Sequence, residues 1–139
     1  MIQYLIDTNI LSELSKSQPN PNVVSKFQLN LSSIAISSVT WHEVLFGCYR
    51  LPISRRREET ERYLLETIHP MIPIIDYDEK AAKWHAAERA RLSEIGLTPA
   101  FADGQIGAIA STRNLILVTR NIKDFTNFRD LTLENWFNI

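Results

Sequence analysis

The sequence is poor in several residues and patterns on which whole classes of protein depend. It has a single cysteine, Cys48, which excludes an internal disulfide and fits a reducing compartment. Its four glycines form no glycine-rich phosphate-binding loop. No apolar run is long enough to cross a bilayer, and the N-terminus lacks the charged start and long apolar stretch of a signal peptide. These absences predict a cytoplasmic protein without a membrane segment.

An excess of charge of either sign is also lacking. Lys and Arg total 15, Asp and Glu total 16, and the formal net charge is −1. This balance gives no overall attraction to nucleic acid, so binding of a polyanion must depend on a local patch. The three histidines have no zinc-ligand spacing, and His85, in an Ala-rich segment, is interpreted as a packed surface residue. The length suits one domain with a full core, predicted to span residues 1–139.

Short apolar runs alternate with helical patterns along the chain. Strands are predicted at residues 3–6, 34–36, 72–75 and 115–118, with a short fifth at 131–133. Helices are predicted at residues 9–16, 23–31, 40–49, 54–68, 79–95 and 99–112. Strands separated by helices predict an α/β fold, in which helices cover both faces of a mainly parallel central sheet of four to five strands.

Four acidic residues lie where these predicted elements meet. Asp7 directly follows the first strand, Glu43 is in the first turn of the helix after the second, and Asp124 is in the turn after the fourth. Asp103 lies near the start of the helix at 99–112. Because sites in such sheets form at the carboxyl ends of the strands, we expect the four acids to gather at one edge. Grouped carboxylates typically bind a hard divalent cation, here Mg²⁺ with Mn²⁺ as a substitute.

Each acid also has a purely structural interpretation. Asp7 fits the N-cap of the following helix. Thr40 and Glu43 have the T-x-x-E form of a capping box, in which the Glu bonds back to a backbone N–H. Asp103 fits a first helical turn, where the helix dipole favours negative charge, and Asp124 fits an ordinary turn. The sequence leaves open whether Glu43 caps a helix or binds metal, and whether Asp124 binds metal directly.

Basic residues gather in one segment, which contains Arg50, Arg55, Arg56, Arg57 and Arg62. A solvated, charged helix face is the default interpretation of such a cluster. If this face borders the acidic edge, it supplies the phosphate contacts that the net charge does not.

Four segments combine into a more specific pattern. They are Leu-Ile-Asp-Thr-Asn at residues 5–9, residues 36–47, residues 102–110, and residues 117–121 leading to Asp124. Together they resemble the PIN-domain ribonucleases, and specifically the VapC-type toxins of toxin–antitoxin pairs. The resemblance implies a PIN-like three-layer α/β/α sandwich with Asp7, Glu43 and Asp103 as the core metal-binding acids. Asp124 matches the fourth acidic position.

The same resemblance implies a set of polar side chains near the metal centre, namely Thr8, Asn9, Thr119 and Asn121. It also implies a Mg²⁺-dependent endoribonuclease that hydrolyses RNA, a small VapB-like antitoxin as partner, and a homodimer. The sequence does not indicate which RNA is cut.

Three other functions would use some of the same residues. A non-catalytic PIN-fold interaction module would keep the shape and lose the acids, yet all four are present. A phosphatase or phosphotransferase of a doubly wound fold often places a nucleophilic Asp after the first strand. Here Asp7 is followed by Thr8 and Asn9, so the second Asp of a D-x-D motif is absent. A DNA-directed nuclease would share the mechanism of an RNase.

Overall fold

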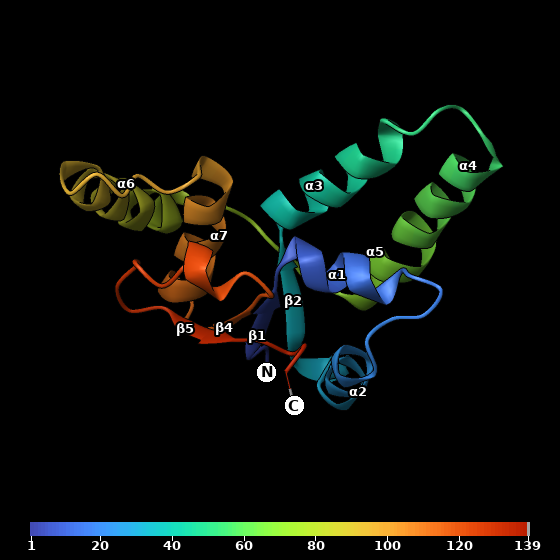
Figure 1. Ribbon diagram of the computed structural model, residues 1–139. Coiled ribbons are helices and arrows are strands. Elements are labelled where there is room, and N and C mark those ends of the chain that lie inside the picture. The colour runs from blue at the N-terminus through green and yellow to red at the C-terminus, as the bar shows by residue number, and fades with distance from the viewer. Residues whose placement is uncertain (139) are drawn as a thin grey trace.

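The sheet at the centre of the molecule is parallel throughout. A computed structural model describes residues 1–138 of the chain (Figure 1). Its strands are β1 (Tyr4–Ile6), β2 (Ile34–Ser37), β3 (Ile74–Ile75), β4 (Ile116–Val118) and β5 (Thr132–Glu134). They form one five-stranded sheet in the order β3-β2-β1-β4-β5, with every neighbouring pair parallel. The predicted fold class is confirmed, including the short fifth strand.

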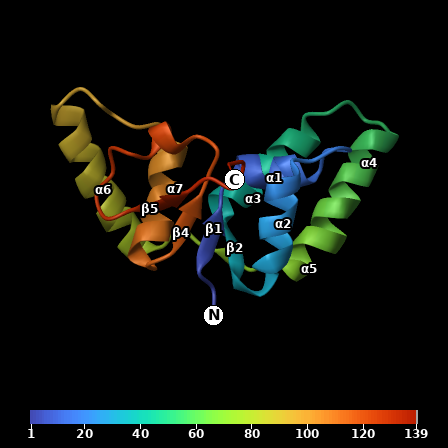
Figure 2. The same ribbon diagram turned by 60° about the horizontal axis from the view of Figure 1, so that its bottom comes forward.

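Helices cover both faces of this sheet. They are α1 (Thr8–Leu14), α2 (Pro21–Leu29), α3 (Ser38–Tyr49), α4 (Arg55–Arg62), α5 (His69–Met71), α6 (Glu79–Glu94) and α7 (Phe101–Thr112). Short 3₁₀ turns are η1 (Leu31–Ser33) and η3 (Ile122–Asp124). Figure 2 shows α6 and α7 on one side of the sheet and α1, α2 and α5 on the other, which gives the predicted three layers. Within residues 1–138, none of the helices is both long and apolar enough to cross a membrane.

The predicted helix at residues 54–68 is interrupted. A π-helical stretch, η2 (Tyr63–Ile68), joins α4 to α5, and the N–H of His69 bonds to the carbonyl of Leu64, five residues earlier. Pro70 follows at once; it has no N–H, and its ring would clash with a carbonyl in a regular helix. The wider π turn accommodates this proline, so the chain continues as a helix up to Met71.

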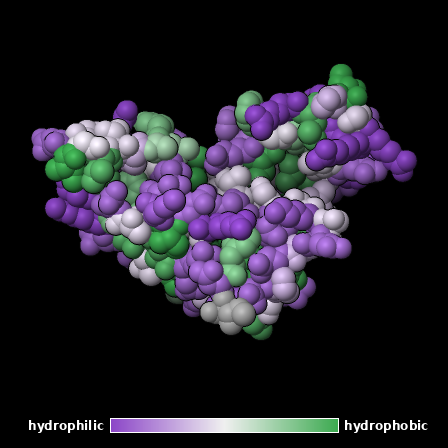
Figure 3. All heavy atoms as spheres, viewed as in Figure 1, coloured by the Kyte–Doolittle hydropathy of each residue, from purple (hydrophilic) through white to green (hydrophobic). Residues whose placement is uncertain are grey.

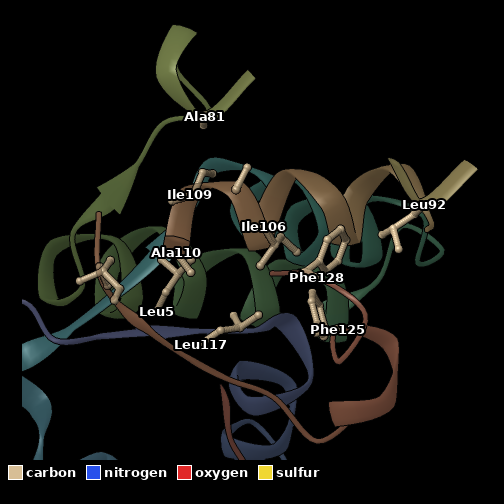
Figure 4. Packing of buried hydrophobic residues seen from close by; sticks show 12 residues of the cluster. Leu5, Ala81, Leu92, Ile106, Ile109, Ala110, Leu117, Phe125 and Phe128 are labelled. Carbon is tan, nitrogen blue, oxygen red and sulfur yellow. The ribbon is translucent and has the colours of Figure 1, made fainter. Parts of the chain in front are cut away.

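Two apolar clusters hold the layers together. One lies between the sheet and the α6–α7 side, where Leu5 and Leu117 of the strands meet Ile106 and Ile109 of α7 (Figure 4). The other lies on the opposite face and includes Ile6, Ile10 and the fully buried Trp136. Adjacent residues of β1 therefore enter opposite cores, as expected of a parallel strand buried on both faces.

Polar residues begin where these strands end. The backbone N–H of Asp7 donates to the carbonyl of Val118 (2.8 Å), and that of Thr119 donates to the carbonyl of Glu134 (2.9 Å). The ladder thus continues one residue past β1 and β4, which fixes Asp7 and Thr119 beside each other. Since sites in parallel sheets form at the edge where the strands end, this edge is the expected position of the site.

Candidate active site

Asp7 is held by hydrogen bonds on both of its carboxylate oxygens. Oδ1 accepts from the backbone N–H of Thr8 (2.8 Å), so Asp7 does serve as the N-cap of α1. Oδ2 accepts from the Thr119 hydroxyl (2.9 Å) and from the Asn9 amide (3.2 Å). Burial raises the pKa of Asp7; the bonds from Thr8 and Thr119 oppose this, and the neighbouring charge of Glu43 adds to it. Capping and membership of an acidic site are therefore compatible in this residue.

The capping-box interpretation of Glu43 is wrong. Helix α3 begins at Ser38, two residues before the predicted start, because the Ser37 hydroxyl accepts from the backbone N–H of Thr40 (2.9 Å) and acts as the N-cap. Glu43 consequently lies beyond the first turn. Its Oε1 accepts from the Thr8 hydroxyl (2.8 Å), which belongs to α1. The carboxylate of Glu43 is thus directed toward the Asp7 side of the molecule.

Asp103 is the acid whose ionisation is most perturbed. It lies in the first turn of α7 and is half-buried. Burial raises its pKa to about 6, and the charges of Asp7, Asp124 and Glu43 contribute in the same direction. A carboxylate in the first turn of a helix is ordinarily favoured by the helix dipole, so repulsion and burial outweigh that effect. The other three predicted acids therefore all act electrostatically on Asp103.

Three of the four acids line one cleft. Its volume is about 450 Å³, and it is lined by Asp7, Thr8, Asn9, Ser12, Glu13, Lys16, Glu43, Asp103, Arg120 and Asn121. Asp124 instead lines a neighbouring hollow that also includes Asp103. Figure 1 places the first turns of α1, α3 and α7 around the base of the opening that Figure 3 shows between the α3–α4 side and the α6–α7 side. Asp124 is thus peripheral, separated from the cleft by Asp103.

The predicted polar residues around the acids divide into two kinds. Thr8, Asn9 and Thr119 each hydrogen-bond an acidic side chain. Thr119 is fully buried, and its hydroxyl also accepts from the backbone N–H of Asn121 (3.1 Å). Asn121 itself lines the cleft without a side-chain bond to an acid among residues 1–138. The first three positions order the carboxylates, and the fourth shapes the wall.

The predicted arginines lie on and around α4, away from the acid cleft. Arg55 pairs with Glu59 (3.0 Å), the Arg50 guanidinium lies over Phe46, and that of Arg57 lies over Tyr49. Arg56 lines a larger, mainly apolar groove of about 630 Å³ between α1, α3 and α4. Thr8 and Glu43 line both this groove and the acid cleft, so the two hollows meet there.

The cations that line the acid cleft are Lys16 and Arg120. Neither was singled out from the sequence. Arg120 had a usable signal, because it lies between the predicted site residues Thr119 and Asn121. Lys16 had none, since a lysine at a helix end is ordinary.

The donors in the cleft fit a hard divalent cation in their chemistry. Carboxylate oxygens are the ligands that Mg²⁺ and Mn²⁺ prefer, and a cation would relieve the repulsion that raises the pKa of Asp103. Their positions do not yet form a closed ligand set. Within residues 1–138, no three His, Cys, Asp or Glu side chains are close enough to share an ion. Binding would require side-chain movements, which Glu43 and Asp103 allow more readily because they are half-buried, whereas Asp7 is buried and hydrogen-bonded on both oxygens.

Comparisons with known proteins give a consistent result. The PIN domain family matches residues 4–131. The tRNA(fMet)-specific endonuclease VapC of Shigella flexneri is 32% identical over 136 residues, covering 98% of this chain and 99% of that protein. Ribonuclease VapC2 of Haemophilus influenzae is 31% identical with the same coverage.

Solved structures agree with the sequence comparisons. The crystal structure of FitAcB from Neisseria gonorrhoeae superposes with a TM-score of 0.91 at 28% identity, covering 99% of this chain and 100% of that one. The DNA-bound VapBC structure from Salmonella typhimurium gives a TM-score of 0.83, also at 28% identity, covering 98% and 99%.

Proposed function

The chain belongs to the PIN-domain family, and we propose that it is a metal-dependent endoribonuclease that acts as the toxin of a toxin–antitoxin pair. The observation that carries the proposal is the cleft in which Asp7, Glu43 and Asp103 converge from three different elements. Relatives of similar length are named as VapC ribonucleases, which supports RNA as the substrate. We place its action in the cytoplasm, where a protein with one free thiol and an RNA substrate would meet.

Each residue of the cleft has a role in this proposal. Asp7, Glu43 and Asp103 would hold Mg²⁺ or Mn²⁺, and Asp124 would assist from the edge. Such an ion makes a water molecule more acidic and offsets the charge that develops on a phosphoryl group. The Thr8 hydroxyl hydrogen-bonds Glu43 and the Thr119 hydroxyl hydrogen-bonds Asp7, so both carboxylates are held at the cleft wall before a metal ion or substrate binds.

A small VapB-like antitoxin is the proposed partner, because the structural neighbours include VapBC and FitAB assemblies. We also propose that the chain forms a homodimer, as the family resemblance implies. Light scattering of the purified chain, alone and with the product of an adjacent short reading frame, would test both. A chain that stays monomeric and binds no such product would contradict them.

The test of the catalytic proposal is cleavage of a panel of RNAs that includes tRNA(fMet). EDTA should abolish cleavage, and Mg²⁺ or Mn²⁺ should restore it. Asp7→Asn and Asp103→Asn should each remove activity while circular dichroism shows a folded protein. The matched control is Asp76→Asn, which changes an exposed acid after β3 in the same way and should leave activity unchanged.

Several outcomes would contradict this proposal. Full metal-dependent cleavage by either Asp7→Asn or Asp103→Asn would remove the acids from the mechanism. Cleavage of DNA in preference to RNA would change the substrate class. A trapped phospho-aspartate would favour a phosphotransferase, and binding of a partner protein without cleavage of any nucleic acid would favour a non-catalytic module.

A further inference from the structure

The acid cleft contains two cations whose surroundings differ. The Lys16 ammonium pairs with Glu13 (2.8 Å). The other carboxylate oxygen of Glu13 accepts from the backbone N–H of Asn20 (2.8 Å), so neither oxygen pairs directly with Arg120. The pKa of Glu13 is lowered chiefly by the hydrogen bond from Lys16, and the charge of Arg120 contributes to this lowering. The Arg120 guanidinium lies over the ring of Phe137, 4.4 Å from its centroid. No acidic side chain among residues 1–138 forms an ion pair with Arg120.

The backbone of Arg120 is fixed relative to the acids. Its N–H donates to the Asn9 Oδ1 (3.1 Å), and the Asn9 amide donates to Asp7 Oδ2 (3.2 Å). Asn9 also donates to the hydroxyl of Thr119, the preceding residue (3.3 Å). Two successive hydrogen bonds therefore connect Arg120 to Asp7, and the side chain starts from a defined place on the cleft wall.

Stacking on an aromatic ring leaves the N–H donors at the edge of a guanidinium available. That edge matches a phosphate, which arginine binds through two parallel hydrogen bonds. Three carboxylates repel an RNA strand that enters the cleft, and a guanidinium on the cleft wall would offset this repulsion beyond what the proposed metal ion supplies. The net charge of −1 supplies no such attraction from the rest of the molecule.

We propose that Arg120, held on the ring of Phe137, binds a phosphate of the RNA strand in the acid cleft. This inference rests on the proposed nuclease function. It assigns the phosphate contact inside the cleft to Arg120, in addition to the arginines near α4. Phe137 acts as a positioning residue, because it holds the guanidinium and does not itself touch the RNA.

The experiment measures the affinity of a fluorescently labelled, mixed-sequence single-stranded RNA at several KCl concentrations. All proteins carry Asp103→Asn, so that the RNA stays uncut. Arg120→Ala should weaken binding by about tenfold, as expected for a charge-assisted contact. It should also flatten the slope of log affinity against log salt by about 0.7, the value for one phosphate on a single strand.

Three further variants separate a phosphate contact from a structural role. Arg120→Lys should keep the salt slope and lose part of the affinity, because the charge remains and the planar fork does not. Phe137→Leu should also weaken RNA binding, by less than Arg120→Ala does. The control is Arg113→Ala, which removes an exposed arginine at the far end of α7 and should change neither quantity.

The result that overturns the inference is an unchanged salt slope in Arg120→Ala, whether or not its melting temperature falls. Equal effects of Arg113→Ala and Arg120→Ala would also overturn it, because the loss would then reflect net charge alone. With Asp103 intact, Arg120→Ala should raise KM more than it lowers kcat. If the unsubstituted chain binds and cuts no RNA, the proposed function itself fails, and that outcome is distinct from a normal enzyme indifferent to Arg120.

Discussion

The packing of His85 against Gly104 predicts that Gly104→Ala changes the stability of the fold in opposite directions when His85 is present and when it is removed. His85 on α6 is 2% exposed, and its ring lies against the backbone of Gly104 on α7, directly after Asp103. A Cβ atom added at Gly104 would lie 2.1 Å from Nε2 and 2.5 Å from Cδ2 of His85. Both distances are far below van der Waals contact, so the two side chains cannot coexist as the helices now stand.

The imidazole ring of His85 cannot easily move away from an added Cβ atom, because other side chains hold it. Its Nδ1 shares a hydrogen bond with the Tyr77 hydroxyl (2.9 Å), and its ring packs 4.9 Å from that of Phe101. Overpacking of this kind costs about 1–3 kcal/mol. Against it stands about 1 kcal/mol of helix propensity gained when Gly becomes Ala. We therefore expect Gly104→Ala to destabilise the fold by up to about 2 kcal/mol.

Removing the imidazole should reverse this effect. In a His85→Ala background the obstructing ring is gone, so Gly104→Ala should be neutral or stabilising by up to about 1 kcal/mol. The coupling between the two sites would then be about 2 kcal/mol, well above the error of additivity for independent positions. Thermal unfolding of the four proteins measures this, at roughly 3–5 °C for each kcal/mol in a chain of this size.

The same four proteins also report on the site, because Asp103 is adjacent to the contact. Cleavage should fall more in Gly104→Ala than in the double variant, which restores the approach of α7 to α6. If Gly104→Ala changes the melting temperature by the same amount in both backgrounds, the His85 ring does not set the distance between these helices, and the reasoning fails.

Further predictions concern charge. The pKa of Glu88 is lowered, chiefly by its hydrogen bonds from Arg91, so its stabilisation is present above pH 4.5 and is lost as pH falls through the folded-state pKa; Glu88→Gln should lower the melting temperature at pH 7 and flatten the acid unfolding curve. Joint substitution of Arg55, Arg56 and Arg57 by Ala should weaken RNA binding and reduce its salt dependence, and an unchanged salt slope would exclude α4 from the RNA path. Above its Kd, Mg²⁺ should raise the melting temperature with the logarithm of its concentration, by the equivalent of about 2.7 kcal/mol at a hundred times Kd; no shift would contradict a metal site.

The sheet was predictable from the sequence because alternation of strands and helices constrains topology strongly. Parallel strands end at one edge, so the acids after β1 and β2 line one cleft, while Asp124 after β4 lines a neighbouring hollow at the same edge. The hydrogen-bond partners were not predictable in the same way. Thr8 bonds to Glu43 and Thr119 bonds to Asp7 across 35 and 112 positions of sequence, respectively. Such contacts depend on how the layers pack, which a local pattern does not contain.

Local patterns also failed where two of them competed. The segment from Ser37 to Glu43 contains three possible N-caps, Ser37, Ser38 and Thr40, and only the last produces a capping box. Ser37 becomes the N-cap because β2 ends at this residue and leaves its hydroxyl at the start of the helix. The prediction that His85 is a surface residue was wrong for a related reason, since the residue is buried. Its Ala-rich surroundings indicated a surface position, but small residues also allow two helices to approach closely, as they do at Gly104.

The position of Glu43 connects the two cationic regions. It lines the acid cleft, where Arg120 lies, and also the groove that Arg56 reaches from α4. In the proposed function, an RNA strand that followed both hollows would meet the carboxylate of Glu43 where they join. Because that carboxylate is held by Thr8 and does not cap a helix, it is available at this junction. The acid with the strongest structural alternative in the sequence is thus the one that lies where the acid cleft and the apolar groove meet.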